Sequence, residues 1–224
     1  FFKNQKNDEQ DIDLWLFSIF YFLSALSELS YIYFGSEAMP PDAIKFYDAA
    51  SDPYWDFNNL STEFIYGFET ESFRGFKEDF IPILIWNKFY RFTNFLNIET
   101  GRYIGIAVNT LFLVWTSYIG LSIIRSTKDL NDKKTENFYK ILFCANGIFW
   151  MYGSIHIRES LIIFFISILL KVWINWINKK SFFNLIILGI ISIIYFLSAE
   201  YLRAGYSSLV FIFIFSFLLI NIIE

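Results

Sequence analysis

The sequence predicts an all-α polytopic membrane protein with about six transmembrane helices and a long, partly helical extracytoplasmic first loop. Hydrophobic residues make up 55% of the 224 residues, and the mean hydropathy is +0.43. Long apolar runs recur along the chain, whereas a soluble domain of this size needs a polar surface. The single cysteine, Cys144, excludes an internal disulfide framework. The composition therefore favours lipid as the solvent for much of the chain.

Apolar segments long enough, or nearly so, to cross a hydrocarbon core of about 30 Å follow one another along the chain. They cover residues 14–34, 103–124, 141–157, 161–177, 182–199 and 204–223. The third and fourth are the shortest, so a tilted or re-entrant hairpin is the alternative for them. The chain begins with Phe1 and ends directly after an apolar run. We therefore expect one membrane domain, residues 1–224, which is a fragment of a longer protein.

The connection over residues 35–102 is the longest polar segment, and it carries all four prolines. Residues 37–79 contain ten acidic and three basic side chains. A segment of this length and charge between two apolar runs is predicted to be an ordered, acidic loop on the extracytoplasmic side.

Two parts of this loop are predicted to be helical. Residues 43–50 contain neither Pro nor Gly and favour a short helix, with Pro41 near its N-terminus. Residues 80–97 mix aromatic side chains with Lys88 and Arg91. That mixture is typical of a helix in the membrane interface, with its rings at headgroup depth and its cationic tips in water.

Basic residues are distributed unevenly over the short connections. The inner connections hold Arg125, Lys128, Lys133, Lys134, Lys179 and Lys180, and the outer turns hold Arg158 and Arg203. Short cytoplasmic loops are enriched in Lys and Arg. This bias predicts a cytoplasmic N-terminus and places the long loop outside.

Under this topology several charged side chains meet at the extracytoplasmic face. The candidate site residues are Glu37, Asp42 and Asp48 in the long loop, Arg158 with Glu159 in one outer turn, and Arg203 in the other. A planar guanidinium can donate two hydrogen bonds to a phosphate, and a carboxylate can take the proton of an attacking hydroxyl. The alternative is structural: Arg–Glu pairs in short turns cap helix ends, and acidic loop residues form a solvated surface.

Other kinds of site are not indicated. The sequence has no phosphate-binding glycine loop, no dinucleotide fingerprint and no Ser-His-Asp arrangement. Asp48 and Asp52 lie one helical turn apart, but Pro53 interrupts the helix beyond them, so no metal site is assigned. No cofactor and no nucleic-acid partner is predicted, and a divalent-metal requirement stays open.

Several short segments occur in an order found in a known family. They are Pro41-Asp42-Ala43 with Phe46 and Tyr47, residues 80–97, Ile157-Arg158-Glu159-Ser160-Leu161-Ile162, and Leu202-Arg203. This order resembles the membrane-embedded glycosyltransferases of the GT-C fold, especially bacterial protein mannosyltransferases and aminoarabinose transferases. The chain departs from the family's Asp-Glu motif because Ala43 follows Asp42.

The resemblance implies a glycosyltransferase of a bacterial inner or plasma membrane. It would move a sugar from a polyprenyl-phosphate donor to a glycan, lipid or protein acceptor. Asp42 would be the catalytic base, with Asp48 as the second choice, and Arg158 and Arg203 would contact the donor phosphate. Glu37 and Glu159 are further candidates for substrate binding.

Two other functions remain open at this stage. A polymerase or ligase of lipid-linked surface polysaccharide also needs arginines and a carboxylate facing outward, although such proteins usually place their large loop later in the chain. A transporter or a non-enzymatic membrane assembly subunit is the alternative of another class. Transport favours ionisable groups near the bilayer midplane and interrupted helices.

Overall fold

The computed structural model describes residues 15–23, 26, 41–52, 80–99, 101–127, 132–155 and 158–202, without the side chains of residues 41–45, 80 and 198–202. All regular structure in these ranges is helical, which confirms the predicted all-α class. The helices are α2 (Pro41–Ser51), α5 (Phe80–Phe95), α6 (Tyr103–Ser126), α7 (Lys133–Cys144), α8 (Gly147–Ser154), α9 (Glu159–Asn178) and α10 (Phe182–Leu202). Most of the predicted span at 14–34, and all of that at 204–223, lies outside the described residues.

Two helices of the described part, α6 and α9, are long and apolar enough to cross a membrane. They correspond to the segments predicted at residues 103–124 and 161–177. In α10, the segment Phe182–Leu197 is also apolar, and Ile190, Ile193, Ile194 and Leu197 are 52–64% exposed. Length, composition and exposed aliphatic side chains thus favour a membrane protein.

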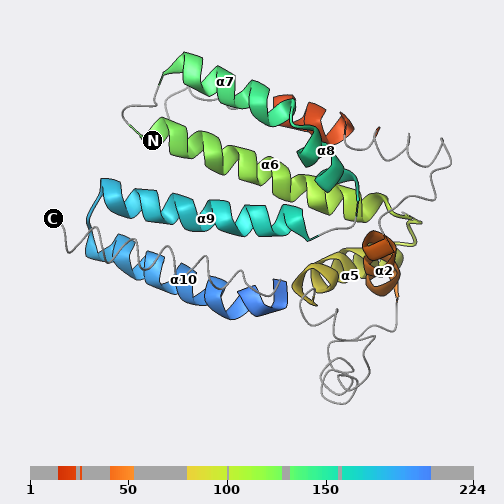
Figure 1. Cartoon of the computed structure of the whole chain (residues 1–224). Coiled ribbons are helices and arrows are strands. Elements are labelled where there is room, and N and C mark those ends of the chain that lie inside the picture. Colours follow the sequence, from red (N-terminus) through yellow and green to blue (C-terminus); the bar gives the residue numbers. More distant parts are fainter. Residues whose placement is uncertain are drawn as a thin grey trace.

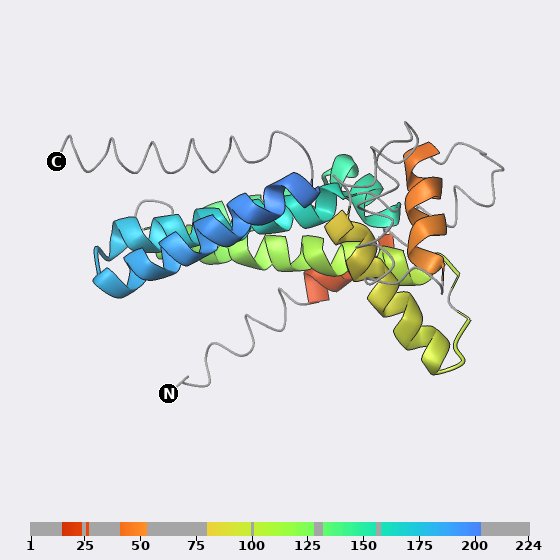
Figure 2. The same ribbon diagram turned by 90° about the horizontal axis from the view of Figure 1, so that it is seen from below.

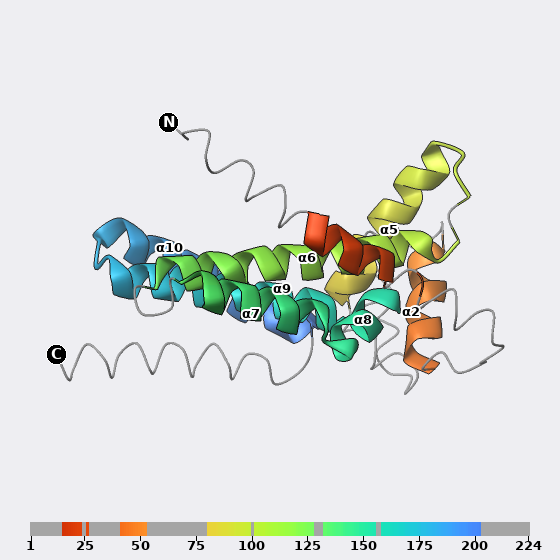
Figure 3. The ribbon, with the colours of Figure 1, turned by 90° about the horizontal axis from the view of Figure 1, so that it is seen from above.

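Helices α6, α7, α9 and α10 lie side by side as a bundle (Figures 1 and 3). α6 packs against both α7 and α9, and α9 packs against α10. α6 and α9 run in one direction, and α7 and α10 run in the other (Figure 1). The end where α6 and α9 begin also holds α2, α5 and α8, and we call it the loop end (Figure 2). The end where α6 and α9 finish is the far end.

Apolar clusters hold neighbouring helices together. Between α9 and α10 the buried residues are Leu169, Trp176, Leu188 and Tyr195, and between α6, α7 and residues 15–23 they are Phe17, Phe20, Leu113 and Phe143. Gly120 of α6 adds a close approach, because a Cβ there would clash with the ring of Tyr139 on α7. The Tyr139 hydroxyl donates to the Ser117 carbonyl at 3.2 Å. The Tyr139 ring of α7 therefore packs directly against the backbone of α6.

Within the segment predicted as one span at residues 141–157, the described residues form two helices separated by a break. Helix α7 begins at Lys133, inside the predicted inner connection, and ends at Cys144, and α8 starts a new helix at Gly147. The Asn146 side chain accepts a hydrogen bond from the Ile148 amide at 3.0 Å and so caps α8. Trp150 Nε1 donates to the Cys144 carbonyl at 2.8 Å and so satisfies the end of α7. The break is stabilised from both sides.

Helix α7 is also fixed at its start, beside the end of α6. The Asp132 side chain caps α7 by accepting from the Thr135 amide at 2.6 Å. Arg125 forms a bidentate pair with Glu136, with Nε 3.0 Å from one carboxylate oxygen and a terminal nitrogen 2.8 Å from the other. The hydrogen bonds from Arg125 hold the pKa of Glu136 below its ordinary value. This pair joins α6 to α7 across the connection.

We expect Glu136→Gln to lower the free energy of unfolding by about 1–2 kcal/mol at neutral pH, because it replaces a charge-assisted bidentate pair at a partly exposed position. Since the folded-state pKa of Glu136 is lowered, its contribution is complete above the ordinary glutamate pKa and is lost as pH falls through the lowered value. Thermal unfolding in detergent over a pH series measures this. The exposed Glu99→Gln is the matched control, and equal shifts for both variants would contradict the assignment.

Candidate functional site

The loop end gathers the elements that carry the predicted site residues. Helices α2, α5 and α8 lie at this end, where α6 and α9 begin and α10 finishes (Figures 1 and 2). Asp42 and Asp48 belong to α2, and Arg158 and Glu159 stand at the start of α9. Arg203 lies outside the described residues, directly after α10. Residues far apart in sequence are therefore brought to one end of the bundle.

The structure describes the side chain of Asp48, one of the two candidate bases on α2, but not that of the other. Asp42 is the second residue of α2, and its side chain is outside the description, as is the whole of Glu37. Asp48 is exposed, and its carbonyl accepts hydrogen bonds from the Asp52 amide at 3.2 Å and from Ser51 Oγ at 3.3 Å. These bonds close the last turn of α2 and leave the Asp48 carboxylate at the surface.

Helix α2 is held against α5 by an apolar cluster and a buried amide. The cluster consists of Phe46 and Ala50 on α2, Ile83, Trp86 and Tyr90 on α5, and Val108 on α6. The Asn87 side chain, 2% exposed, donates to the carbonyl oxygens of Ala50 at 2.9 Å and Asp52 at 3.1 Å. Because these carbonyls lie at the C-terminus of α2, Asn87 caps that helix from α5. The acidic helix is thereby fixed in place.

A second buried amide joins α5, α6 and the end of α8. Asn109 of α6 is 1% exposed, and its Oδ1 accepts from Trp86 Nε1 at 2.9 Å. Its Nδ2 donates to the carbonyl oxygens of Ile155 at 2.6 Å and Tyr152 at 3.5 Å. Neither Asn87 nor Asn109 is among the residues predicted from the sequence. The signal that could have found them is an amide inside an apolar helix, since a buried polar group requires partners.

Arg158 and Glu159 form a long ion pair at the start of α9. Arg158 Nε lies 4.0 Å from Glu159 Oε1, and the side chains are 18% and 24% exposed. A carboxylate at this position suits the positive end of the helix dipole, whereas a guanidinium does not. Arg158 occupies the N-cap position without a capping hydrogen bond from its side chain. Arg158 thus adds positive charge where the helix already carries it.

The start of α6 repeats this arrangement with Arg102, which the sequence analysis also missed. Arg102 occupies the N-cap position of α6, again without a side-chain cap. Its guanidinium carbon lies 5.4 Å from the centre of the Tyr47 ring on α2, and that ring packs edge-on against Tyr90. Because α6 and α9 run in the same direction, two arginine-bearing N-termini face the loop end. An arginine directly before an apolar run was the signal in the sequence.

Within the part of the chain that the structure describes, two buried hydroxyls near these helix starts have no hydrogen-bond partner. They are Thr110 Oγ1 on α6 and Ser160 Oγ on α9, and both residues are fully buried. An unsatisfied buried hydroxyl costs about 1–3 kcal/mol, so such groups call for an explanation. Ser160 follows Arg158 by two residues, so a hydroxyl donor and a guanidinium share the first turn of α9.

Known proteins give no assignment for the loop end. Comparisons of the chain with protein-family models, with curated proteins and with solved structures find no match. Within the ranges that the structure describes, no group of three or more His, Cys, Asp or Glu side chains could hold a metal ion. The function of this end is therefore inferred from its own charges and helix termini.

We expect Asn87→Ala to loosen α2 without unfolding the bundle, because it removes the two hydrogen bonds that cap α2 from α5. Backbone amide exchange in α2 should accelerate by about 5- to 30-fold, while exchange in α9 stays the same. Hydrogen–deuterium exchange of the purified protein measures both helices. The matched control is Asn94→Ala at an exposed position of α5, and equal acceleration of α2 in both variants would show that Asn87 does not hold the helix.

Proposed function

We propose that this chain is a membrane-embedded glycosyltransferase of the GT-C type, which uses a polyprenyl-phosphate-linked sugar at the extracytoplasmic face. The observation that carries the proposal is the pair of arginines, Arg102 and Arg158, at the N-termini of two parallel helices. The acidic helix α2 lies at the same end of the bundle (Figure 2). Anion binding and proton acceptance are the two functions that such a transfer needs from a protein.

The helix starts support binding of the donor phosphate. Each helix N-terminus carries about half a positive charge and presents unpaired backbone N–H groups, so it favours an anion. Arg158 and Ser160 add a guanidinium and an unpartnered hydroxyl to the first turn of α9. The charge of Arg158 is unfavourable beside the positive end of α9, and a bound phosphate would make it favourable. Arg203 remains the third proposed phosphate contact, with Glu37 and Glu159 as further contacts to substrate.

The proposed reaction is a single displacement at the sugar. The acceptor hydroxyl oxygen attacks the anomeric carbon, and the bond between that carbon and the lipid-phosphate oxygen breaks. The departing phosphate takes the bonding electrons, and its growing negative charge is stabilised by the arginines and by α9. Asp42 accepts the hydroxyl proton as general base, and Asp48 is the second candidate. The low dielectric constant of a dry membrane face strengthens these charge interactions.

The proposed topology directs the loop end outward and the far end toward the cytoplasm. Of about six proposed spans, α6, α9 and α10 supply three, and α7 with α8 returns the chain beside α6. Lys133, Lys134, Lys179 and Lys180 belong to the far end, which agrees with the positive-inside bias. The N-terminus would be cytoplasmic, and the membrane would be a bacterial inner or plasma membrane.

We predict that Asp42→Asn lowers the turnover rate about 10²- to 10⁴-fold, because an amide cannot accept the proton of the attacking hydroxyl. Sugar transfer from a defined polyprenyl-monophosphate donor measures the rate, and donor binding should persist. Asp48→Asn is the comparison. Activity lost in Asp48→Asn alone would assign the base to Asp48, and full activity in both variants would remove α2 from the mechanism. Consumption of a lipid diphosphate alone would favour a polymerase or ligase.

For Arg158→Gln we predict a loss in kcat/KM of about 10- to 100-fold, because a charge-assisted contact to the departing phosphate disappears. Steady-state kinetics with the same donor measure this loss. The melting temperature of the variant should not fall below that of the wild type. Lys88→Gln, at an exposed position of α5, is the control for a general change in charge. An equal loss in both variants would mean that Arg158 acts only through the net charge of the loop end.

A further inference from the structure

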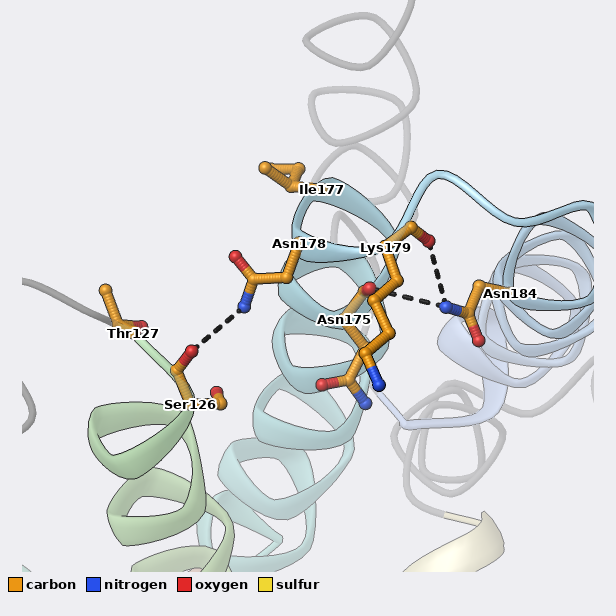
Figure 4. Close-up of a pocket in the computed structure, with 7 residues that line it drawn as sticks. All are labelled: Ser126, Thr127, Asn175, Ile177, Asn178, Lys179 and Asn184. Atoms are coloured by element: carbon orange, nitrogen blue, oxygen red, sulfur yellow. Dashed lines mark hydrogen bonds between the residues drawn. The ribbon is translucent and has the colours of Figure 1, made fainter.

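A cavity opens at the far end of the bundle, away from all the proposed site residues. Its volume is about 830 Å³, and it lies where α6 and α9 end and α10 begins (Figure 4). Its lining residues are Ser126, Thr127, Asn175, Ile177, Asn178, Lys179 and Asn184. The proposed transferase reaction uses none of them.

Side chains donate hydrogen bonds to several backbone carbonyls at the ends of α6 and α9. Lys171 Nζ donates to the Ser122 carbonyl at 2.9 Å and to Ser126 Oγ at 3.3 Å. Asn178 Nδ2 donates to the Ser126 carbonyl at 3.2 Å. Asn184 Nδ2 donates to the carbonyls of Lys179 at 3.0 Å and Asn175 at 3.4 Å (Figure 4). Part of the acceptor capacity at the ends of α6 and α9 is therefore satisfied within the protein.

Two donors of the cavity wall remain available to a ligand. Within the described residues, the Lys179 ammonium and the Asn175 side-chain amide make no hydrogen bond or ion pair. Among the seven lining residues, Lys179 carries the formal charge. None of the seven lining residues is acidic, and Glu136 beside the end of α6 is paired with Arg125. The cavity therefore offers net positive charge and an amide donor, which suits a phosphate group.

Exposed apolar side chains at the far end favour a lipid over a free phosphate ion as the ligand. Ile177 is part of the cavity wall and is 37% exposed. Phe182 and Phe183, at the start of α10, are 78% and 69% exposed. A ligand that contacts both Lys179 and these apolar side chains has a phosphate headgroup attached to hydrocarbon chains.

We propose that the far-end cavity binds the headgroup of an anionic phospholipid, with Lys179 and Asn175 contacting the phosphate and the apolar side chains of Ile177, Phe182 and Phe183 contacting the acyl chains. The site requires that the far end lies at a membrane surface. It does not require glycosyl transfer, so its test is independent of the catalytic proposal.

The experiment is native mass spectrometry of the purified full chain in neutral detergent, titrated with phosphatidylglycerol. We expect one tightly retained lipid, and Lys179→Gln should weaken its binding about fivefold, the effect of one lysine at a membrane surface. Lys88→Gln at the loop end is the matched control and should bind as the wild type does. Phosphatidylcholine should be retained more weakly than phosphatidylglycerol by the wild type and equally by both variants.

Three results would overturn the proposal. The first is an equal loss in Lys179→Gln and Lys88→Gln, and the second is equal retention of the two lipids by the wild type. The third is displacement of phosphatidylglycerol by millimolar inorganic phosphate with the same dependence on Lys179, which would assign the cavity to free phosphate. If thermal unfolding shows that Lys179→Gln is poorly folded, Asn175→Ala replaces it and must weaken phosphatidylglycerol binding relative to Lys88→Gln.

Discussion

The buried amide of Asn109 is the contact on which the arrangement of the loop end depends. It accepts from the indole of Trp86 on α5 and donates to the carbonyls of Ile155 and Tyr152 at the end of α8. In surroundings without water, each unpaired polar group costs several kcal/mol, so α5 and α8 cannot slide along α6 without a large penalty. Since α2 rests on α5 through Asn87, the position of the acidic helix follows from the same contact.

The two ends of the bundle differ in chemistry because α6 and α9 run in the same direction. Parallel neighbours place their positive helix ends together at the loop end and their negative ends together at the far end. The chain increases the positive charge at the loop end with Arg102 and Arg158. At the far end, Lys171 and two asparagine amides donate hydrogen bonds to backbone carbonyls. Cationic side chains therefore stand at the helix starts, and hydrogen-bond donors satisfy carbonyls at the helix ends.

Hydrophobic pattern predicted the helices that contain one uninterrupted apolar run, such as α6 and α9. It did not predict where α7 begins or the break between α7 and α8. The polar residues from Lys133 onward form the first turns of α7, and a window that seeks apolar residues assigns such turns to a loop. The break itself depends on Asn146 and Trp150, whose hydrogen bonds satisfy the two helix ends. Periodicity does not reveal these bonds, because they depend on where a side chain points.

The sequence by itself determined the all-helical class, the short helix α2 and the long apolar helices, because these follow from local propensity and from the distribution of apolar residues. It also singled out Asp42, Asp48, Arg158 and Glu159 as charged residues at element ends. The order of the apolar runs also predicted that these residues meet on one side. Only the tertiary structure decided that Arg102 joins them and that Asn87 and Asn109 hold the junction. The reason is physical: such contacts form between residues distant in the chain, after the helices have packed.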